Sequence, residues 1–168
     1  KLRLPASEMS MTFWQAVGAS PTAMSGSEVF TAIQQGTIDG QENGVPITDS
    51  AKMYEVQKYL TLWNYCYDAD LVIANSKVWD SLDEKTQDLL KECIAEACEW
   101  GNDKIVEDEK TLIEKFKDNG MQVDELTDEQ LEPFKELIKE PMNEIKAKYG
   151  KDACEAFGID TEGVKFSN

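Results

Sequence analysis

The sequence predicts an α/β protein, because short segments of strand type alternate with helical segments that carry caps. Residues 2–5 alternate as a strand does, residues 9–17 are apolar at helical spacing, and residues 20–24 form a second short strand. Ser25 and Glu28 then have the spacing of a capping box, which opens the next helix. Such alternation is typical of helices layered on a sheet.

The rest of the chain continues the pattern with longer elements. We expect a helix at 49–62, a buried strand at 71–73, a long helix at 83–118, a strand at 121–126 and a helix at 127–149. The long helix would reach about 50 Å at 1.5 Å per residue, so it either bridges two lobes or breaks near Gly101. A second capping box at Thr127 and Gln130 opens the last of these helices, in which Pro141 predicts a kink.

The composition describes a globular chain with a strongly acidic balance. Its 168 residues suggest one domain, and a hydrophobic fraction of 41% is enough to bury a core. The net charge of −16 argues against nucleic acid and anionic membrane surfaces as partners. No run approaches the roughly 18 apolar residues that a membrane-spanning helix needs.

The absence of histidine excludes several chemistries. Ser-His-Asp and Cys-His catalysis are impossible, and the commonest metal ligand is missing. The four cysteines form no CxxC pair, so we expect no zinc site, and we expect no cofactor. We expect them to be buried or partly buried thiols, although a disulfide between two of them stays possible. The four are Cys66, Cys93, Cys98 and Cys154.

Arg3 is the only arginine among 17 basic residues. A guanidinium presents paired donors that match a carboxylate in a bidentate way, which lysine cannot do. The position therefore predicts a carboxylate-binding arginine, with a surface arginine near the start of the chain as the alternative.

Asn43 and Gln41 follow a tight turn at Asp39 and Gly40. The Asn43 amide can donate to the same anion and accept from a ligand hydroxyl. The alternative for both residues is an ordinary role in the turn.

Aromatic residues and one aspartate complete the candidate binding residues. Trp63 and Tyr67 lie just before the expected strand at 71–73, Asp70 enters that strand, and Trp14 lies in the first helix. Asp70 can accept hydrogen bonds from ligand hydroxyls. Core packing for the aromatic residues, and a helix cap or solvated end for Asp70, are the alternatives.

Residues 18–43, GASPTAMSGSEVFTAIQQGTIDGQEN, carry a resemblance to a known family. With KLRLP before them, EVQKYL at 55–60 and WDSL at 79–82, they resemble the DctP-type solute-binding proteins of TRAP (tripartite ATP-independent periplasmic) transporters. The resemblance extends over the whole chain.

The resemblance implies a role for three residues. It makes Arg3 the arginine that clamps a ligand carboxylate and Asn43 the asparagine that helps to hold it, and it places Asp70 near a position that varies with the ligand. Gly26 stands where an aromatic residue often lines the pocket. Together with Asp70, Trp63 and Tyr67, this favours a monocarboxylate with hydroxyls, such as a sugar acid, over a compact dicarboxylate.

The resemblance also implies a periplasmic-binding-protein-like fold of two lobes, of which this chain resembles the second half. Residues 1–68 and 108–168 would form the second lobe, and residues 69–107 would be the crossover strand and long bridging helix that belong partly to the first lobe. Such a fragment would expose apolar surface around residues 71–73 and self-associate.

The function that the resemblance implies is binding without chemistry. The protein would be an extracytoplasmic subunit, periplasmic or at the cell surface, that binds a small organic acid and delivers it to the membrane subunits of a TRAP transporter. The alternative is an α/β enzyme that acts on a small carboxylate substrate, because carboxylates are plentiful although no spacing singles out an acid/base pair.

Overall fold

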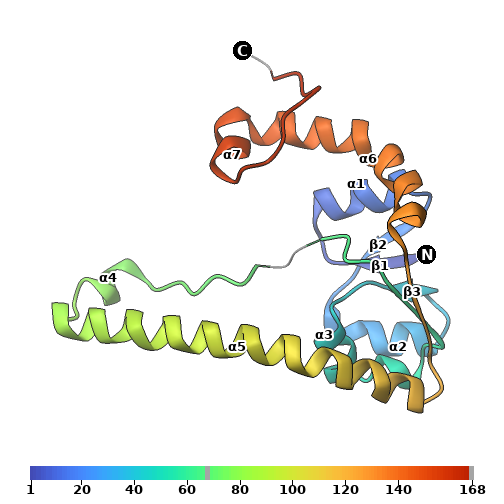
Figure 1. Ribbon diagram of the computed structural model, residues 1–168, viewed down its shortest axis with the longest axis horizontal. Coiled ribbons are helices and arrows are strands. Elements are labelled where there is room, and N and C mark those ends of the chain that lie inside the picture. Colours follow the sequence, from blue (N-terminus) through green and yellow to red (C-terminus); the bar gives the residue numbers. More distant parts are fainter. Residues whose placement is uncertain (67–68, 167–168) are drawn as a thin grey trace.

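The computed structural model describes residues 1–66 and 69–166, which build two small parallel sheets with helices around them (Figure 1). The first sheet has the order β2-β1-β3. Its strands are β1 (Leu2–Leu4), β2 (Pro21–Ala23) and β3 (Gly40–Gln41). In the second sheet β4 (Tyr59–Leu62) pairs in parallel with β5 (Gln122–Glu125). The predicted α/β class is confirmed.

Helices connect the parallel strands, since a parallel pair needs a crossover connection. The α-helices are α1 (Glu8–Ala16), α2 (Val29–Gln34), α3 (Val45–Ser50), α4 (Ser76–Trp79), α5 (Glu84–Asp118), α6 (Asp128–Tyr149) and α7 (Lys151–Ala156). Two 3₁₀ turns are η1 (Gly26–Glu28) and η2 (Met53–Glu55).

Local signals set several of the helix ends. Gly18 follows α1 with a φ of +91°, the left-handed region that glycine adopts without strain. The capping box of α6 is confirmed, because Gln130 N donates to Thr127 Oγ1 (3.3 Å) and Thr127 N donates to Gln130 Oε1 (2.9 Å). The capping box predicted at Ser25 is wrong. The Ser25 hydroxyl pairs with Ser27 Oγ (3.0 Å), and the helical segment begins with the 3₁₀ turn η1, which α2 follows.

Two apolar clusters form the core beside the sheets. One buries Val29 and Ala32 of α2 together with Ile38 and Met53. The other cluster buries Val45 of α3, Phe116 of α5 and Met121, which precedes β5.

The C-terminal end of α5 is anchored firmly to the rest of the fold. Phe116 is fully buried and stacks on Tyr54, with ring centroids 5.6 Å apart. Beside it, Lys115 Nζ lies 2.6 Å from Asp49 Oδ1. These contacts fix the direction in which the helix leaves the core.

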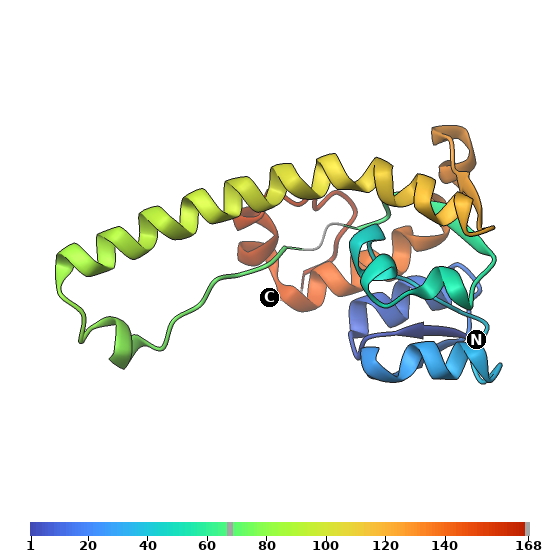
Figure 2. The same ribbon diagram turned by 90° about the horizontal axis from the view of Figure 1, so that it is seen from below.

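The outer part of α5 projects away from both sheets (Figures 1 and 2). The helix runs without interruption for 35 residues, so the break allowed at Gly101 does not occur. The extended segment 69–75 and α4 lead outward to its far end (Figure 2).

Two predicted elements are wrong. The helix expected at 49–62 is instead the end of α3, the turn η2 and strand β4, because Lys52 adopts a left-handed φ of 52° that stops the helix. The buried strand expected at 71–73 forms no strand and is exposed, with Ile73 at 87%.

The cysteines differ in exposure to solvent. Cys154 is buried as expected, whereas Cys93 and Cys98 are exposed on α5. Over residues 1–66 and 69–166, no helix combines the length and the apolar character that crossing a membrane requires.

Candidate ligand-binding site

The carboxyl edge of the first sheet collects the polar residues that the sequence singles out. Arg3 in β1 lies opposite Gln41 in β3, so the two side chains leave the sheet on the same face. Asn43 follows two residues later, just beyond the end of β3. In open parallel α/β sheets, ligands bind outside the carboxyl ends of the strands.

Arg3 is buried to 7% exposure in an unusual electrostatic setting. Its Nε donates to the Met24 carbonyl oxygen at 2.9 Å, which fixes the guanidinium. The ion pairs among the described residues do not include Arg3. A methyl group added at Gly26 would stand 3.8 Å from Arg3 Nη2, so the absence of a side chain there keeps this edge of the guanidinium open.

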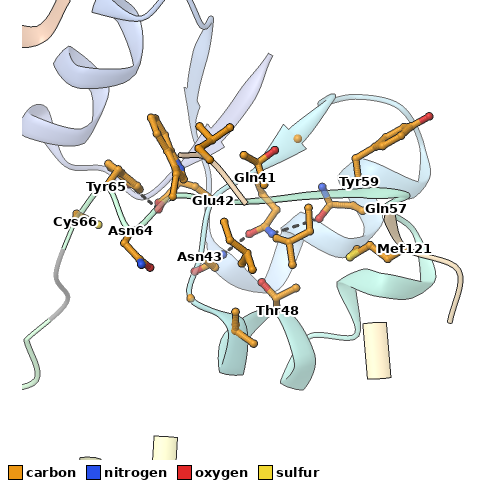
Figure 3. Close-up of a pocket in the computed structure, with 18 of the residues that line it drawn as sticks. Gln41, Glu42, Asn43, Thr48, Gln57, Tyr59, Asn64, Tyr65, Cys66 and Met121 are labelled. Atoms are coloured by element: carbon orange, nitrogen blue, oxygen red, sulfur yellow. Dashed lines mark hydrogen bonds between the residues drawn. The ribbon is translucent and has the colours of Figure 1, made fainter. Parts of the chain in front are cut away.

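Three side-chain amides form a chain on the same face of the sheet (Figure 3). Asn43 Nδ2 donates to Gln41 Oε1, and Gln41 Nε2 donates to Gln57 Oε1 at 3.3 Å. Thr48 lies nearby in α3, and its buried hydroxyl has no hydrogen-bond partner within the described part of the chain. Because Gln57 accepts from Gln41, and Gln41 accepts from Asn43, these hydrogen bonds fix the orientation of the Asn43 amide.

An aromatic cluster lies on the other side of the chain that follows β3. The rings of Trp14, Trp63 and Tyr65 contact one another at centroid distances of 5.2 to 5.3 Å. Tyr65 Oη donates to Glu42 Oε2 at 2.7 Å (Figure 3). The Tyr65–Glu42 hydrogen bond therefore connects the residues just after β3 with the segment that follows β4.

Burial raises the pKa of the Tyr65 hydroxyl far above its ordinary value. The indole N–H of Trp14 acts in the opposite direction, and the carboxylate of Glu42 adds to the rise. Tyr65 is thus a neutral hydrogen-bond donor. The buried Trp14 Nε1 has no acceptor at hydrogen-bonding geometry among the residues described.

A cavity of about 490 Å³ connects the amide chain and the aromatic cluster. Four of the predicted binding residues line it: Trp14, Gln41, Asn43 and Trp63. Arg3 is not among its lining residues and lies instead beside Gly26. Asp70 is exposed and outside the lining, and Tyr67 lies outside the described residues.

Sequence reasoning missed Gln57 and Thr48, which also line this cavity. Gln57 lies in the EVQKYL run, where its place in a predicted helix hid its role. Thr48 gave no signal, because only the fold brings α3 against β3. Among residues 1–66 and 69–166, no group of three or more acidic or cysteine side chains can hold a metal ion.

Buried Arg3 lies on a parallel α/β layer and has no ion-pair partner among the described residues, a setting that suits an anion. Comparison with known families matches residues 1–148 to the bacterial extracellular solute-binding protein, family 7 (DctP). The chain belongs to this family of solute-binding proteins, and the resemblance seen in the sequence is confirmed.

Curated relatives support the assignment. The chain is 32% identical over 151 residues to the sialic acid-binding periplasmic protein SiaP of Vibrio cholerae, covering 90% of this chain and 46% of SiaP. It is 31% identical to the C4-dicarboxylate-binding periplasmic protein DctP of Rhodobacter capsulatus, covering 93% and 47%. The chain thus spans about half the length of these relatives.

Solved structures agree with this. The sugar acid binding protein DctPAm of Advenella mimigardefordensis, in complex with galactonate, matches with a TM-score of 0.86 and 29% identity over 93% of this chain and 50% of its own. A TRAP periplasmic solute binding protein of Polaromonas, bound to D-erythronate, matches with a TM-score of 0.84 and 32% identity over 99% and 53%. The family is one of transport proteins, which supports the non-enzymatic interpretation and not the enzyme alternative.

Proposed function

We propose that the chain forms one part of the ligand site of a TRAP-type solute-binding protein and holds the carboxylate of an organic acid. Arg3 supplies the positive charge and a bidentate pair of donors, and the Asn43 amide supplies a further hydrogen bond. Binding is followed by closure of two lobes and release of the acid unchanged.

The observation that carries this proposal is that Arg3 is buried without an ion-pair partner among the described residues. A buried charge is costly unless an opposite charge or hydrogen bonds compensate it. One carbonyl oxygen satisfies Nε, and no ion pair among the described residues satisfies the remaining positive charge. A ligand carboxylate supplies that charge in a matching planar geometry.

The other predicted residues would shape the ligand. Trp14 and Trp63 offer flat apolar faces, Gln41 orients Asn43, and Asp70 and Tyr67 stay predictions from the sequence. We propose a hydroxylated monocarboxylate such as a sugar acid, which is consistent with the galactonate and D-erythronate of the two relatives. The proposal assigns residues 1–68 and 108–168 to the ligand-clamping lobe and 69–107 to the crossing between lobes.

The family is periplasmic, and we propose the same location for this protein, with the membrane subunits of a TRAP transporter as its partners. The acid would pass to those subunits from the open form.

Titration of the isotope-labelled 168-residue chain by NMR tests the carboxylate clamp, because it detects weak binding. Galactonate, erythronate and succinate at millimolar concentration should shift the Arg3 Nε–H and the Asn43 side-chain amide, with the hydroxylated acids stronger. Arg3→Lys should weaken the binding at least tenfold, since the charge remains and the fork is lost.

Lys77→Gln, which removes a positive charge from exposed α4, is the matched control and should leave the titration unchanged. If no acid perturbs the Arg3 signal, or if both variants titrate like the parent, the clamp is wrong. If succinate alone binds, the clamp stands and the preference for sugar acids is wrong.

A further inference from the structure

Glu42 is a carboxylate in the candidate site that the proposed function does not use. It stands between Gln41 and Asn43 in the chain, and all three residues line the cavity. Glu42 is half-buried and takes part in none of the ion pairs among the described residues. Because a partly desolvated carboxylate without a cation is costly, it needs hydrogen-bond donors beside it.

Tyr65 supplies one such donor and leaves the other side of the carboxylate open. The Tyr65 hydroxyl donates to Glu42 Oε2 at 2.7 Å (Figure 3). Glu42 Oε1 has no hydrogen-bond partner within residues 1–66 and 69–166. An ionised carboxylate accepts through both of its oxygens, so one oxygen remains for a donor from a ligand.

The aromatic cluster fixes Tyr65 and so fixes the carboxylate. The Tyr65 ring packs against Phe13 and Trp14 at centroid distances of 4.9 and 5.3 Å and stacks on Trp63 at 5.2 Å. Burial raises the pKa of its hydroxyl, so the phenol stays protonated and keeps donating. Glu42 is therefore held at one place on the cavity wall.

The two sides of the chain after β3 differ in the charge that they accept. Figure 3 shows Asn43 directed toward Gln41 and Glu42 directed toward Tyr65. Two carboxylates in contact repel each other, and the repulsion grows where little water screens it. The carboxylate of a bound acid therefore belongs near Arg3 and Asn43, and an uncharged part of the ligand belongs near Glu42.

A hydroxyl is the ligand group that suits the surroundings of Glu42. A second carboxylate has no proton to donate, and an alkyl group would leave Glu42 Oε1 unpaired. Asn64 lies beside Tyr65 and also lines the cavity, so its amide can donate back to a hydroxyl oxygen (Figure 3). An ammonium group can donate to Glu42 but accepts nothing from Asn64.

We propose that Glu42 determines which acid is bound, by accepting a hydrogen bond from a ligand hydroxyl and repelling a second carboxylate. Tyr65 acts through Glu42 and is a positioning residue. Asp70, which the sequence suggested as the hydroxyl acceptor, lies outside the lining of the cavity. The proposal rests on the proposed function, because Arg3 has to hold the carboxylate at the other end of the ligand.

Titration of the 168-residue chain by NMR with four acids of four carbons each tests this selection. The acids are erythronate, butyrate, succinate and 4-aminobutyrate, and the Arg3 Nε–H signal reports the clamp for each. Erythronate should bind at least about tenfold more tightly than butyrate or succinate, since a hydrogen bond to a charged group contributes this much.

Glu42→Gln removes the charge and keeps the size of the side chain. The preference for erythronate over succinate should fall at least about tenfold, because succinate is no longer repelled and the acceptor is weaker. Glu55→Gln removes the same charge from an exposed site in η2 outside the cavity lining, so it should leave the preference unchanged.

Tyr65→Phe separates positioning from packing. It should lower the same preference in the parent, because Glu42 is no longer held. In the Glu42→Gln background it should change the preference no further, whereas a purely structural effect would appear in both backgrounds.

Each remaining outcome bears on one of the two proposals. If the acids shift the Arg3 signal and Glu42→Gln keeps the preference, or changes it no more than Glu55→Gln does, selection by Glu42 is wrong and the clamp stands. If 4-aminobutyrate binds more tightly than erythronate, the assignment to a hydroxyl is wrong. If no acid shifts the Arg3 signal, the clamp is wrong and the selection falls with it.

Discussion

Arg3 and Tyr65 show how the same fold treats two polar side chains at the residue scale. Both are withdrawn from water, yet Tyr65 has Glu42 as its acceptor whereas the charge of Arg3 has no ion-pair partner among the described residues. A buried polar group with a hydrogen-bond partner is stable, whereas a buried charge without an opposite charge costs free energy that an anionic ligand would offset. This difference supports a structural role for Tyr65 and the proposed binding role for Arg3.

Tyr65 leads to a prediction about alkaline pH. Its pKa is raised in the folded state, so the phenol stays neutral there while the unfolded chain ionises above about pH 10. Stability from this group is fully present below that pH and is lost as the pH rises further. The parent should therefore lose more unfolding free energy between about pH 9 and 11 than Tyr65→Phe, measured by urea unfolding.

Tyr59→Phe is the control, because Tyr59 is an exposed tyrosine in the neighbouring strand. It should follow the parent over the same pH range. Parallel loss of stability in the parent and Tyr65→Phe would show that burial of Tyr65 does not govern its ionisation.

Phe116 leads to a second prediction at this scale. It is fully buried, packs against Val45 and Met121 and stacks on Tyr54, so Phe116→Ala should cost about 3–5 kcal/mol of unfolding free energy. Chemical denaturation measures it. Leu112→Ala, at a half-buried site one turn earlier, should cost clearly less. Equal costs would mean that Phe116 is not the anchor of α5.

At the scale of elements, the sequence predicted what local chemistry determines and failed where distant partners decide. The capping box of Thr127 and Gln130 is such a local signal, and the structure confirms it. Tyr59 and the rest of β4 were assigned to a helix, because their apolar spacing also suits one. Only β5, some sixty residues later, selects the strand, and such tertiary context overrides propensity.

The candidate site was predicted to a similar degree. Arg3, Gln41 and Asn43 were proposed from residue type and the turn. Arg3 lies opposite Gln41 in the sheet and Asn43 donates to Gln41, while their role in binding stays a prediction. Gln57 was missed because it was assigned to a helix that in fact ends before Lys52, and a left-handed lysine has no sequence signature. Thr48 was missed because only the fold brings α3 to the cavity.

Gly101 leads to a prediction about α5. It lies within the helix, and a methyl group added there meets nothing within 4 Å. Gly101→Ala should stabilise the helix locally by about 0.5–1 kcal/mol, which corresponds to roughly two- to fivefold slower amide exchange around it. Hydrogen exchange of residues 97–105 measures this.

Gly150 provides the matched control, since it has a φ of +89° that alanine adopts only with strain. Gly150→Ala should speed exchange at the junction of α6 and α7. Unchanged exchange in Gly101→Ala would mean that the outer part of α5 opens as a unit, independently of its intrinsic helix propensity.

At the scale of the whole molecule, the two separate sheets and the projecting α5 follow from pairings that no local pattern records. Residues 71–73 were predicted to be a buried strand because all three are apolar, and burial is what such residues favour. In this chain they are exposed.

The final prediction concerns the charge of the whole molecule. The chain carries 33 acidic and 17 basic residues, and self-repulsion at a net charge of −16 destabilises the compact state. On α5, Glu92, Glu96, Glu99 and Asp103 follow one another at spacings of three or four residues, where like charges repel. Salt shortens the screening length from about 30 Å at 0.01 M to about 3 Å at 1 M. The melting temperature should therefore rise with sodium chloride over this range, as measured by circular dichroism.

A double variant, Glu96→Gln with Glu99→Gln, should have a higher melting temperature at low salt and a smaller rise with sodium chloride. A melting temperature that falls with salt would show instead that attractive ion pairs, such as Lys115 with Asp49, outweigh the repulsion.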